Sequence, residues 1–222
     1  MMAHELLHAV AAATKARRCL LVTAEVTGNP LLEHVSVRSF ETLVSLQYEM
    51  PEGGTGLGFR PIARVAREAR RLGQFDVAFL DPHHSYESSE AAFRLFGRST
   101  QDHGWLIAHD CLPSYELSSP VLVRGAWCGS TYAAFRDVAR RSDRAWFVVD
   151  DDFGLGVLGP RKTGHLVTHE VPAEPADRWD RSDIDTKREL YREHGHLLMR
   201  AVSPGRADEV LGRLLRNEPV EL

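Results

Sequence analysis

Short apolar segments alternate along the chain with longer segments of helical periodicity. Residues 75–80 (FDVAFL) and 145–150 (AWFVVD) are nearly continuous apolar runs bounded by polar or turn-forming residues, which is typical of buried strands. Residues 61–72 (PIARVAREARRL) begin with proline and are amphipathic, which predicts a helix. The pattern predicts further strands at 19–26, 44–50 and 105–108, and further helices at 4–16, 87–96, 129–141, 184–199 and 205–216.

This alternation predicts an α/β fold with a doubly wound, mostly parallel sheet and helices on both faces. Strands that are buried on both faces read as continuous apolar runs, as these do. We expect residues 1–160 to form this domain, and residues 161–222 to be a C-terminal extension of loop and helices that packs on it. The stretch 172–185, rich in proline and aspartate, is predicted to be a surface loop.

Composition excludes several classes of protein. The 222 residues are 43% hydrophobic and 26% charged, which suits a globular domain with a sizeable core. The net charge of −4 argues against a nucleic-acid partner, and the lack of an apolar run of 18 residues argues against a membrane span. The three cysteines form no CxxC pair and the first residues do not resemble a signal peptide, so we expect a cytoplasmic protein.

Two segments that combine acid and imidazole each follow a predicted strand. Residues 81–87 (DPHHSYE) follow one strand, and His109 and Asp110 follow the next. Because the carboxyl ends of parallel strands meet at one edge of a sheet, where ligands bind, these side chains are expected to converge. Carboxylate and imidazole together suit a divalent metal, and imidazole also suits a general base. The alternative is that they cap the following helices and turns.

The stretch 75–111 resembles class I methyltransferases whose fourth strand ends in D-x-x-H-x-Y-E and whose fifth strand ends in H-D. The resemblance continues through 127–132 and 150–156, and Pro82 stands where the family usually has glycine. It implies a Rossmann-like fold and S-adenosylmethionine (SAM) as the cofactor, lying over the first two strands.

The resemblance also implies roles for individual residues. In metal-dependent members the matching positions hold Mg²⁺, which implicates Asp81, His109 and Asp110 as metal ligands here. An imidazole at position 109 widens the choice to other divalent metals, while members with histidine there can also act without a metal. His84 is the implied general base for a substrate hydroxyl, and Asp81 is implied in catalysis beside it.

The SAM-binding turn departs from the family pattern E/D-x-G-x-x-x-G. Val22 replaces the acid and Ala24 replaces the first glycine, so that only Gly28 remains. Ala24, Gly28 and Asp81 are the implied cofactor-binding residues, and Glu41 and Glu49 are candidates for the acid that binds the ribose hydroxyls. Glycines in this turn normally let the backbone approach the ligand closely.

Two functions are therefore carried forward. The first is a SAM-dependent methyltransferase that acts on a hydroxyl of a small molecule, a sugar or a specialised metabolite, with or without metal assistance. The second keeps the fold but has lost SAM, leaving a metal-dependent non-methylating enzyme or a binding subunit. The expected partner is a small-molecule substrate, with no nucleic acid and no membrane, and homo-oligomerisation stays open.

Two further motifs have weaker support. Residues 4–8 (HELLH) match the H-E-x-x-H pattern of zinc peptidases, but they lie close to the N-terminus and no third ligand follows at a recognisable spacing. Residues 53–58 (GGTGLG) form a glycine-rich segment that lacks the lysine of a phosphate-binding loop.

Overall fold

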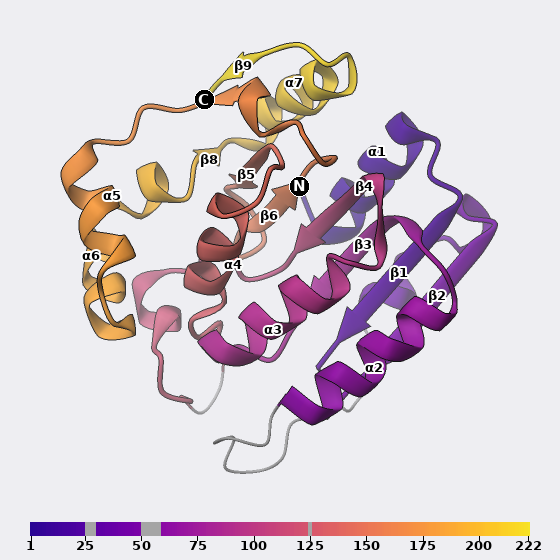
Figure 1. Cartoon of the computed structure of the whole chain (residues 1–222), viewed down its shortest axis with the longest axis horizontal. Coiled ribbons are helices and arrows are strands. Elements are labelled where there is room, and N and C mark those ends of the chain that lie inside the picture. Colours follow the sequence, from indigo (N-terminus) through magenta and orange to yellow (C-terminus); the bar gives the residue numbers. More distant parts are fainter. Residues whose placement is uncertain (25–29, 50–58, 124–125) are drawn as a thin grey trace.

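The computed structural model describes residues 1–24, 30–49, 59–123 and 126–222, and a seven-stranded sheet forms its centre (Figure 1). The strand order is β2-β1-β3-β4-β6-β5-β8, and a two-stranded sheet pairs β7 with β9. The strands are β1 (Arg18–Thr23), β2 (Thr42–Gln47), β3 (Phe75–Asp81), β4 (Thr100–Ala108), β5 (Trp146–Val149), β6 (Leu155–Leu158), β7 (Val167–Thr168), β8 (Ala201–Val202) and β9 (Val220–Glu221).

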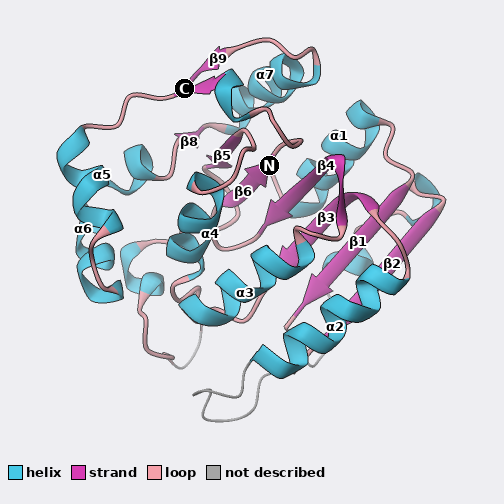
Figure 2. Ribbon diagram, in the orientation of Figure 1, coloured by secondary structure: helices cyan, strands magenta, loops and turns pink. Residues whose placement is uncertain are grey.

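Helices cover both faces of the sheet. Figure 2 shows α2 and α3 in front of the strands and α1 behind them. The helices are α1 (Ala3–Thr14), α2 (Phe59–Arg71), α3 (Tyr86–Phe96), α4 (Thr131–Arg140), α5 (Ala173–Asp180), α6 (Ile184–Leu198) and α7 (Pro204–Leu215). The expected α/β class, a mostly parallel sheet between two layers of helices, is confirmed.

Each face of the sheet has its own buried core. Along β3, Ala78 and Leu80 face the core shared with α2 to α6, whereas Val77 and Phe79 face the core shared with α1 and α7. This division follows from the two-residue period of a strand, which sends successive side chains to opposite faces. Both cores need apolar residues, so the sequence of β3 reads as a continuous apolar run.

The direction of chain connection reverses beside β1. Strand β1 pairs in parallel with β2 on one side and with β3 on the other, so the connection from β2 to β3 crosses over β1. In open α/β sheets, ligands bind in the crevice beyond the carboxyl ends of the strands at such a switch point. The carboxyl ends of β1 and β3 are therefore the expected ligand-binding edge of this fold.

The structure corrects the sequence expectations at three places. The segment 153–159 contains a strand, β6, which runs antiparallel to both of its neighbours. The strand predicted at 105–108 begins earlier, at Thr100, because a register shift opposite Phe75 and Val77 lets β4 continue through His103 and Gly104. The expected surface loop 172–185 contains helix α5, which is held to the core by the fully buried Trp179.

No helix in the described part of the chain is long and apolar enough to cross a bilayer.

Candidate active site

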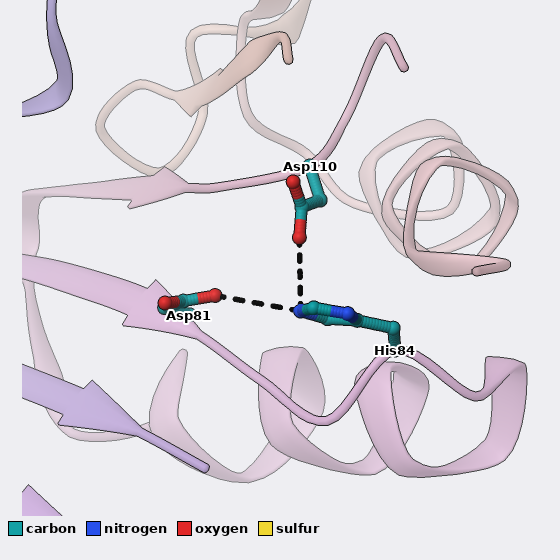
Figure 3. A group of neighbouring side chains, drawn as sticks. All are labelled: Asp81, His84 and Asp110. Carbon is teal, nitrogen blue, oxygen red and sulfur yellow. Dashed lines mark ion pairs between the residues drawn. The ribbon is translucent and has the colours of Figure 1, made fainter. Parts of the chain in front are cut away.

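Adjacent parallel strands bring the candidate residues together at one edge of the sheet (Figure 3). Asp81 is the last residue of β3, and His84 lies in the turn that leads from it into α3. His109 and Asp110 directly follow β4, the parallel neighbour of β3. The sequence predicted this convergence, and Figure 3 shows the His84 ring pointing towards both carboxylates.

Asp81, His84 and Asp110 form a compact group of donor atoms. One ligand atom from each lies within 4.8 Å of the others. His84 Nε2 is 2.9 Å from Asp110 Oδ2 and 3.7 Å from Asp81 Oδ1. Asp110 is only 3% exposed, so its charge is withdrawn from water and must be balanced inside the site.

His109 lies on the other side of the same carboxylates. Its Nδ1 is 3.3 Å from Asp110 Oδ1 and 3.9 Å from Asp81 Oδ1. Its Nε2 is 3.6 Å from Oδ1 of Asp152, which follows β5. The sequence places Asp152 just after the predicted strand at 145–150, and this position is the signal that it reaches the same edge of the sheet.

The backbone at Asp110 is unusual for a residue with a side chain. Its φ of +60° lies in the left-handed region, which aspartate tolerates better than most residues. The next two residues fix this conformation, because Cys111 N donates to Gly154 O and Leu112 N donates to Phe153 O, each at 2.8 Å. The turn after β5 thereby holds the Asp110 carboxylate over the end of β3.

Opposite charges stabilise one another in this cluster. Burial lowers the pKa of His84, but hydrogen bonds with Asp110 and Asp81 outweigh burial and raise that pKa to about 10. Burial likewise lowers the pKa of His109, and bonds with Asp110 and Asp152 raise it to about 10. Burial raises the pKa of Asp110, whereas its bonds with both imidazoles hold it well below the usual range. In this arrangement Asp110 favours the charged form of each imidazole, and the two imidazoles favour the charged form of Asp110.

The donor set fits a divalent cation. Ligand atoms at right angles around a cation, each at about 2.1 Å, lie about 3 Å apart, which is close to the His84–Asp110 separation. Two carboxylates with one imidazole suit Mg²⁺, Mn²⁺ or a softer divalent ion. Of the three predicted metal ligands, Asp81 and Asp110 belong to this group, whereas His109 stands beside it and His84 supplies the imidazole.

The predicted cofactor residues are only partly described. Gly28 and the segment 53–58 lie outside the described residues. Ala24 directly follows β1, and its N–H donates to Asp81 O at 3.0 Å, so Ala24 lies at the switch point. Glu41 pairs with Arg17 at the amino ends of the strands, which is the wrong edge for a ribose-binding acid.

A cavity of about 280 Å³ opens beside the cluster on the α1 side of the sheet. Asp81, His109 and Asp152 line it, and His84 does not. The rest of its lining is mainly apolar with two imidazoles, contributed by Met2, Ala3, His4, Leu31, Glu33, His34 and Phe79.

The HELLH histidines contact different partners. The His4 ring lies against the His34 ring at 5.1 Å, whereas the His8 ring stacks on Phe40 at 6.5 Å. Within the described residues, Asp81, His84 and Asp110 are the group that could hold a metal, and neither histidine belongs to it.

No protein-family model matches the chain, and no curated protein matches its sequence. Similar folds occur among solved structures of O-methyltransferases. A Staphylococcus aureus protein assigned as a caffeoyl-CoA O-methyltransferase is 10% identical, with 70% of this chain and 81% of that chain covered and a TM-score of 0.48. The methyltransferase MycE of the mycinamycin pathway, solved with Mg, SAH and mycinamycin VI, is 14% identical, with 77% and 51% covered and a TM-score of 0.46. A Geobacter sulfurreducens methyltransferase is 14% identical, with 71% and 77% covered and a TM-score of 0.41.

Proposed function

We propose that this chain is a SAM-dependent methyltransferase that acts on a hydroxyl of a small molecule, with a divalent cation held by Asp81, His84 and Asp110. One observation carries the proposal: two carboxylates and an imidazole converge at the carboxyl ends of β3 and β4, beside the switch point at β1. The D-x-x-H-x-Y-E and H-D motifs support SAM as the methyl donor.

The two histidines take different roles in this proposal. His84 is assigned to the cation because its Nε2 faces both carboxylates. His109 is assigned to the acceptor because it lines the cavity and His84 does not. The sequence-based assignment had these roles the other way round. Fold and motif do not distinguish the two rings, so the assignment proposed here rests on their positions relative to the cavity.

The cavity is the proposed site of the acceptor. Its apolar wall at Phe79 and Leu31 accommodates the body of a small molecule, and its polar end at Asp81, His109 and Asp152 orients the hydroxyl. When bound, the cation acidifies that hydroxyl and SAM supplies the methyl group. With a cation held by Asp81, His84 and Asp110, the neutral form of His109 would be favoured, and this ring would accept the hydroxyl proton. The remaining contribution is positioning of the acceptor oxygen.

A metal-dependent enzyme that does not methylate is the second candidate. The observation that favours it is Val22, which stands where the family has an acid and is 1% exposed within the core next to α2. This position therefore presents no polar group to a cofactor. Glu49 just beyond β2 is exposed at the correct edge and could still meet a ribose.

Calorimetric titration of SAM, with and without Mg²⁺ or Mn²⁺, separates the two candidates. Micromolar binding of SAM is the expected result, and a screen of hydroxylated acceptors with radiolabelled SAM would follow. Cation uptake without any SAM binding would contradict the methyltransferase proposal and favour the second candidate.

Replacing either proposed carboxylate ligand tests the site directly. In Asp81→Asn and Asp110→Asn we expect Mn²⁺ affinity and turnover to fall by on the order of 100-fold or more, because an amide is a poorer ligand than a carboxylate. The matched control is Asp102→Asn, whose side chain is 90% exposed. Wild-type Mn²⁺ affinity in both site variants, in protein that melts normally, would exclude this metal site.

A further inference from the structure

The segment Trp127–Ser130, which carries no role in the proposed function so far, surrounds His84. The Trp127 carbonyl oxygen lies 2.5 Å from His84 Nδ1, and Ser130 N donates to the His84 carbonyl at 2.7 Å. Both the ring and the backbone of His84 are therefore held by one short turn. We propose that residues 127–130 position His84 so that its Nε2 always faces Asp81 and Asp110.

The ring contact determines where the imidazole proton sits. A backbone carbonyl can only accept a hydrogen bond, so Nδ1 of His84 must carry a proton in this arrangement. The nitrogen left for a cation is then Nε2, which is the atom 2.9 Å from Asp110 Oδ2. Histidines that bind metals usually donate their other ring N–H to a carbonyl or carboxylate in this way.

The backbone contact leaves no room for a side chain at Gly129. Its φ is +58°, and a Cβ placed there would lie 2.1 Å from the His84 carbonyl oxygen. A side chain at this position must therefore displace the backbone of either His84 or the turn. The lack of a side chain at Gly129 lets the turn lie directly against the backbone of His84.

The turn is itself anchored on the segment that follows β4. Cys128 N and Gly129 N both donate to Leu117 O at 3.0 Å, and Trp127 Nε1 donates to Ser119 O at 2.7 Å. The Trp127 ring also lies against the His84 ring, with centroids 5.5 Å apart. His84 is thus tied to the 115–119 region through the turn, in addition to its own place before α3.

Gly129→Ala is the variant that tests this positioning role, which rests on the proposed cation site. We expect its Mn²⁺ affinity to fall about 10- to 100-fold, the usual effect of losing a partner of a metal-binding histidine. Gly205→Ala is the matched control, because nothing lies within 4 Å of a Cβ added there. Trp127→Phe keeps an aromatic ring but removes the bond to Ser119, and we expect a smaller loss in the same direction.

Nitrogen-15 NMR of the wild-type protein gives a readout that needs no variant. We expect the Nδ1–H of His84 to be hydrogen-bonded to the Trp127 carbonyl in both the metal-free and the Mg²⁺-treated protein, and Nε2 to lack a proton only after Mg²⁺ is added. A His84 ring protonated at Nε2 alone, or Gly129→Ala protein that binds Mn²⁺ like wild type, would overturn the positioning role. Wild-type protein that binds no Mn²⁺ but shows the Nδ1–H of His84 bonded to the Trp127 carbonyl would instead remove the cation from the proposed function and leave the positioning role standing.

Discussion

At the scale of single residues, two imidazoles contact the same pair of carboxylates from different sides. His84 contacts Asp81 and Asp110 from the turn before α3, and its second nitrogen is occupied by the Trp127 carbonyl. His109 contacts the same carboxylates from the cavity side. Replacing His84 by a neutral amide should therefore mainly weaken cation binding, whereas the same replacement of His109 should mainly slow the reaction of the acceptor.

We expect His84→Gln to lose Mn²⁺ affinity by on the order of 10-fold or more, because the amide is a weaker ligand than an imidazole. His109→Gln should keep Mn²⁺ affinity within about threefold and lower kcat by about 100-fold, the usual contribution of a positioned general base. Calorimetry with Mn²⁺ and methyl-transfer kinetics measure the two effects. Equal effects of both substitutions on Mn²⁺ affinity would contradict the separation of roles.

The sequence could predict which residues reach this edge but not how they pair. Asp81, His109 and Asp110 follow parallel strands, so strand direction alone brings them together. The proposed choice of His84 rather than His109 as the metal ligand rests on the direction of His84 Nε2 and on which ring lines the cavity. Neither follows from spacing, because both depend on segments far away along the chain.

At the scale of elements, one buried carboxylate joins four helices. Asp137 of α4 accepts hydrogen bonds from Tyr86 of α3 at 2.7 Å and from Trp179 of α5 at 2.8 Å. Lys187 of α6 donates to the same carboxylate at 2.6 Å. Asp137 is 4% exposed and Lys187 is 7% exposed, so each charge depends on the other.

We expect Asp137→Asn to destabilise the protein by about 3 to 5 kcal/mol, because it leaves the Lys187 ammonium buried without a counter-charge. Burial raises the pKa of Asp137, but bonds from Lys187, Tyr86 and Trp179 outweigh it and hold the pKa below its ordinary value of 3.8. A carboxylate with a depressed folded-state pKa contributes stability above the unfolded-state pKa and loses it as pH falls through the folded-state pKa.

Urea unfolding between pH 2 and pH 7 measures both effects. The acid-induced loss of stability below about pH 4 should be smaller in Asp137→Asn than in wild type. Asp208→Asn, on the exposed side of α7, is the matched control. If the free energy of unfolding of Asp137→Asn falls as steeply at low pH as that of the wild type, Asp137 is not a source of this pH dependence.

Helices and strands were predicted correctly where their own sequence pattern indicates the structure they form. They were missed where a contact with a distant segment determines the structure. Helix α5 was read as a loop because it lies in the segment 172–185, which holds two prolines and four aspartates, yet Trp179 is buried and bonded to Asp137. Strand β6 was missed because it is only four residues long and contains Gly156, where an added Cβ would lie 2.7 Å from Phe135 and Cys111. Close packing requires glycine at this position, whereas a propensity scale counts glycine as a residue that ends a strand.

At the scale of the whole molecule, the last sixty or so residues are part of both cores rather than an appendage. Strand β8 extends the sheet by pairing in parallel with β5. Tyr191 of α6 lies 4.1 Å from the Tyr132 ring of α4, and Val210 of α7 is fully buried in the core on the α1 side. The predicted boundary near residue 160 thus separates segments that bury each other's apolar surface.

This sharing predicts that a fragment of residues 1–160 does not fold by itself. Removing α5, α6, α7 and β8 would expose Tyr132 of α4 and the free edge of β5, and burial of apolar surface contributes about 25 cal/mol per Å² to stability. We expect the full chain to unfold in one transition that is the same by far- and near-ultraviolet circular dichroism. The fragment should lack near-ultraviolet signal and bind the dye ANS. A fragment that melts cooperatively, or a full chain with two separate transitions, would show instead that residues 161–222 form an extension on a self-sufficient domain.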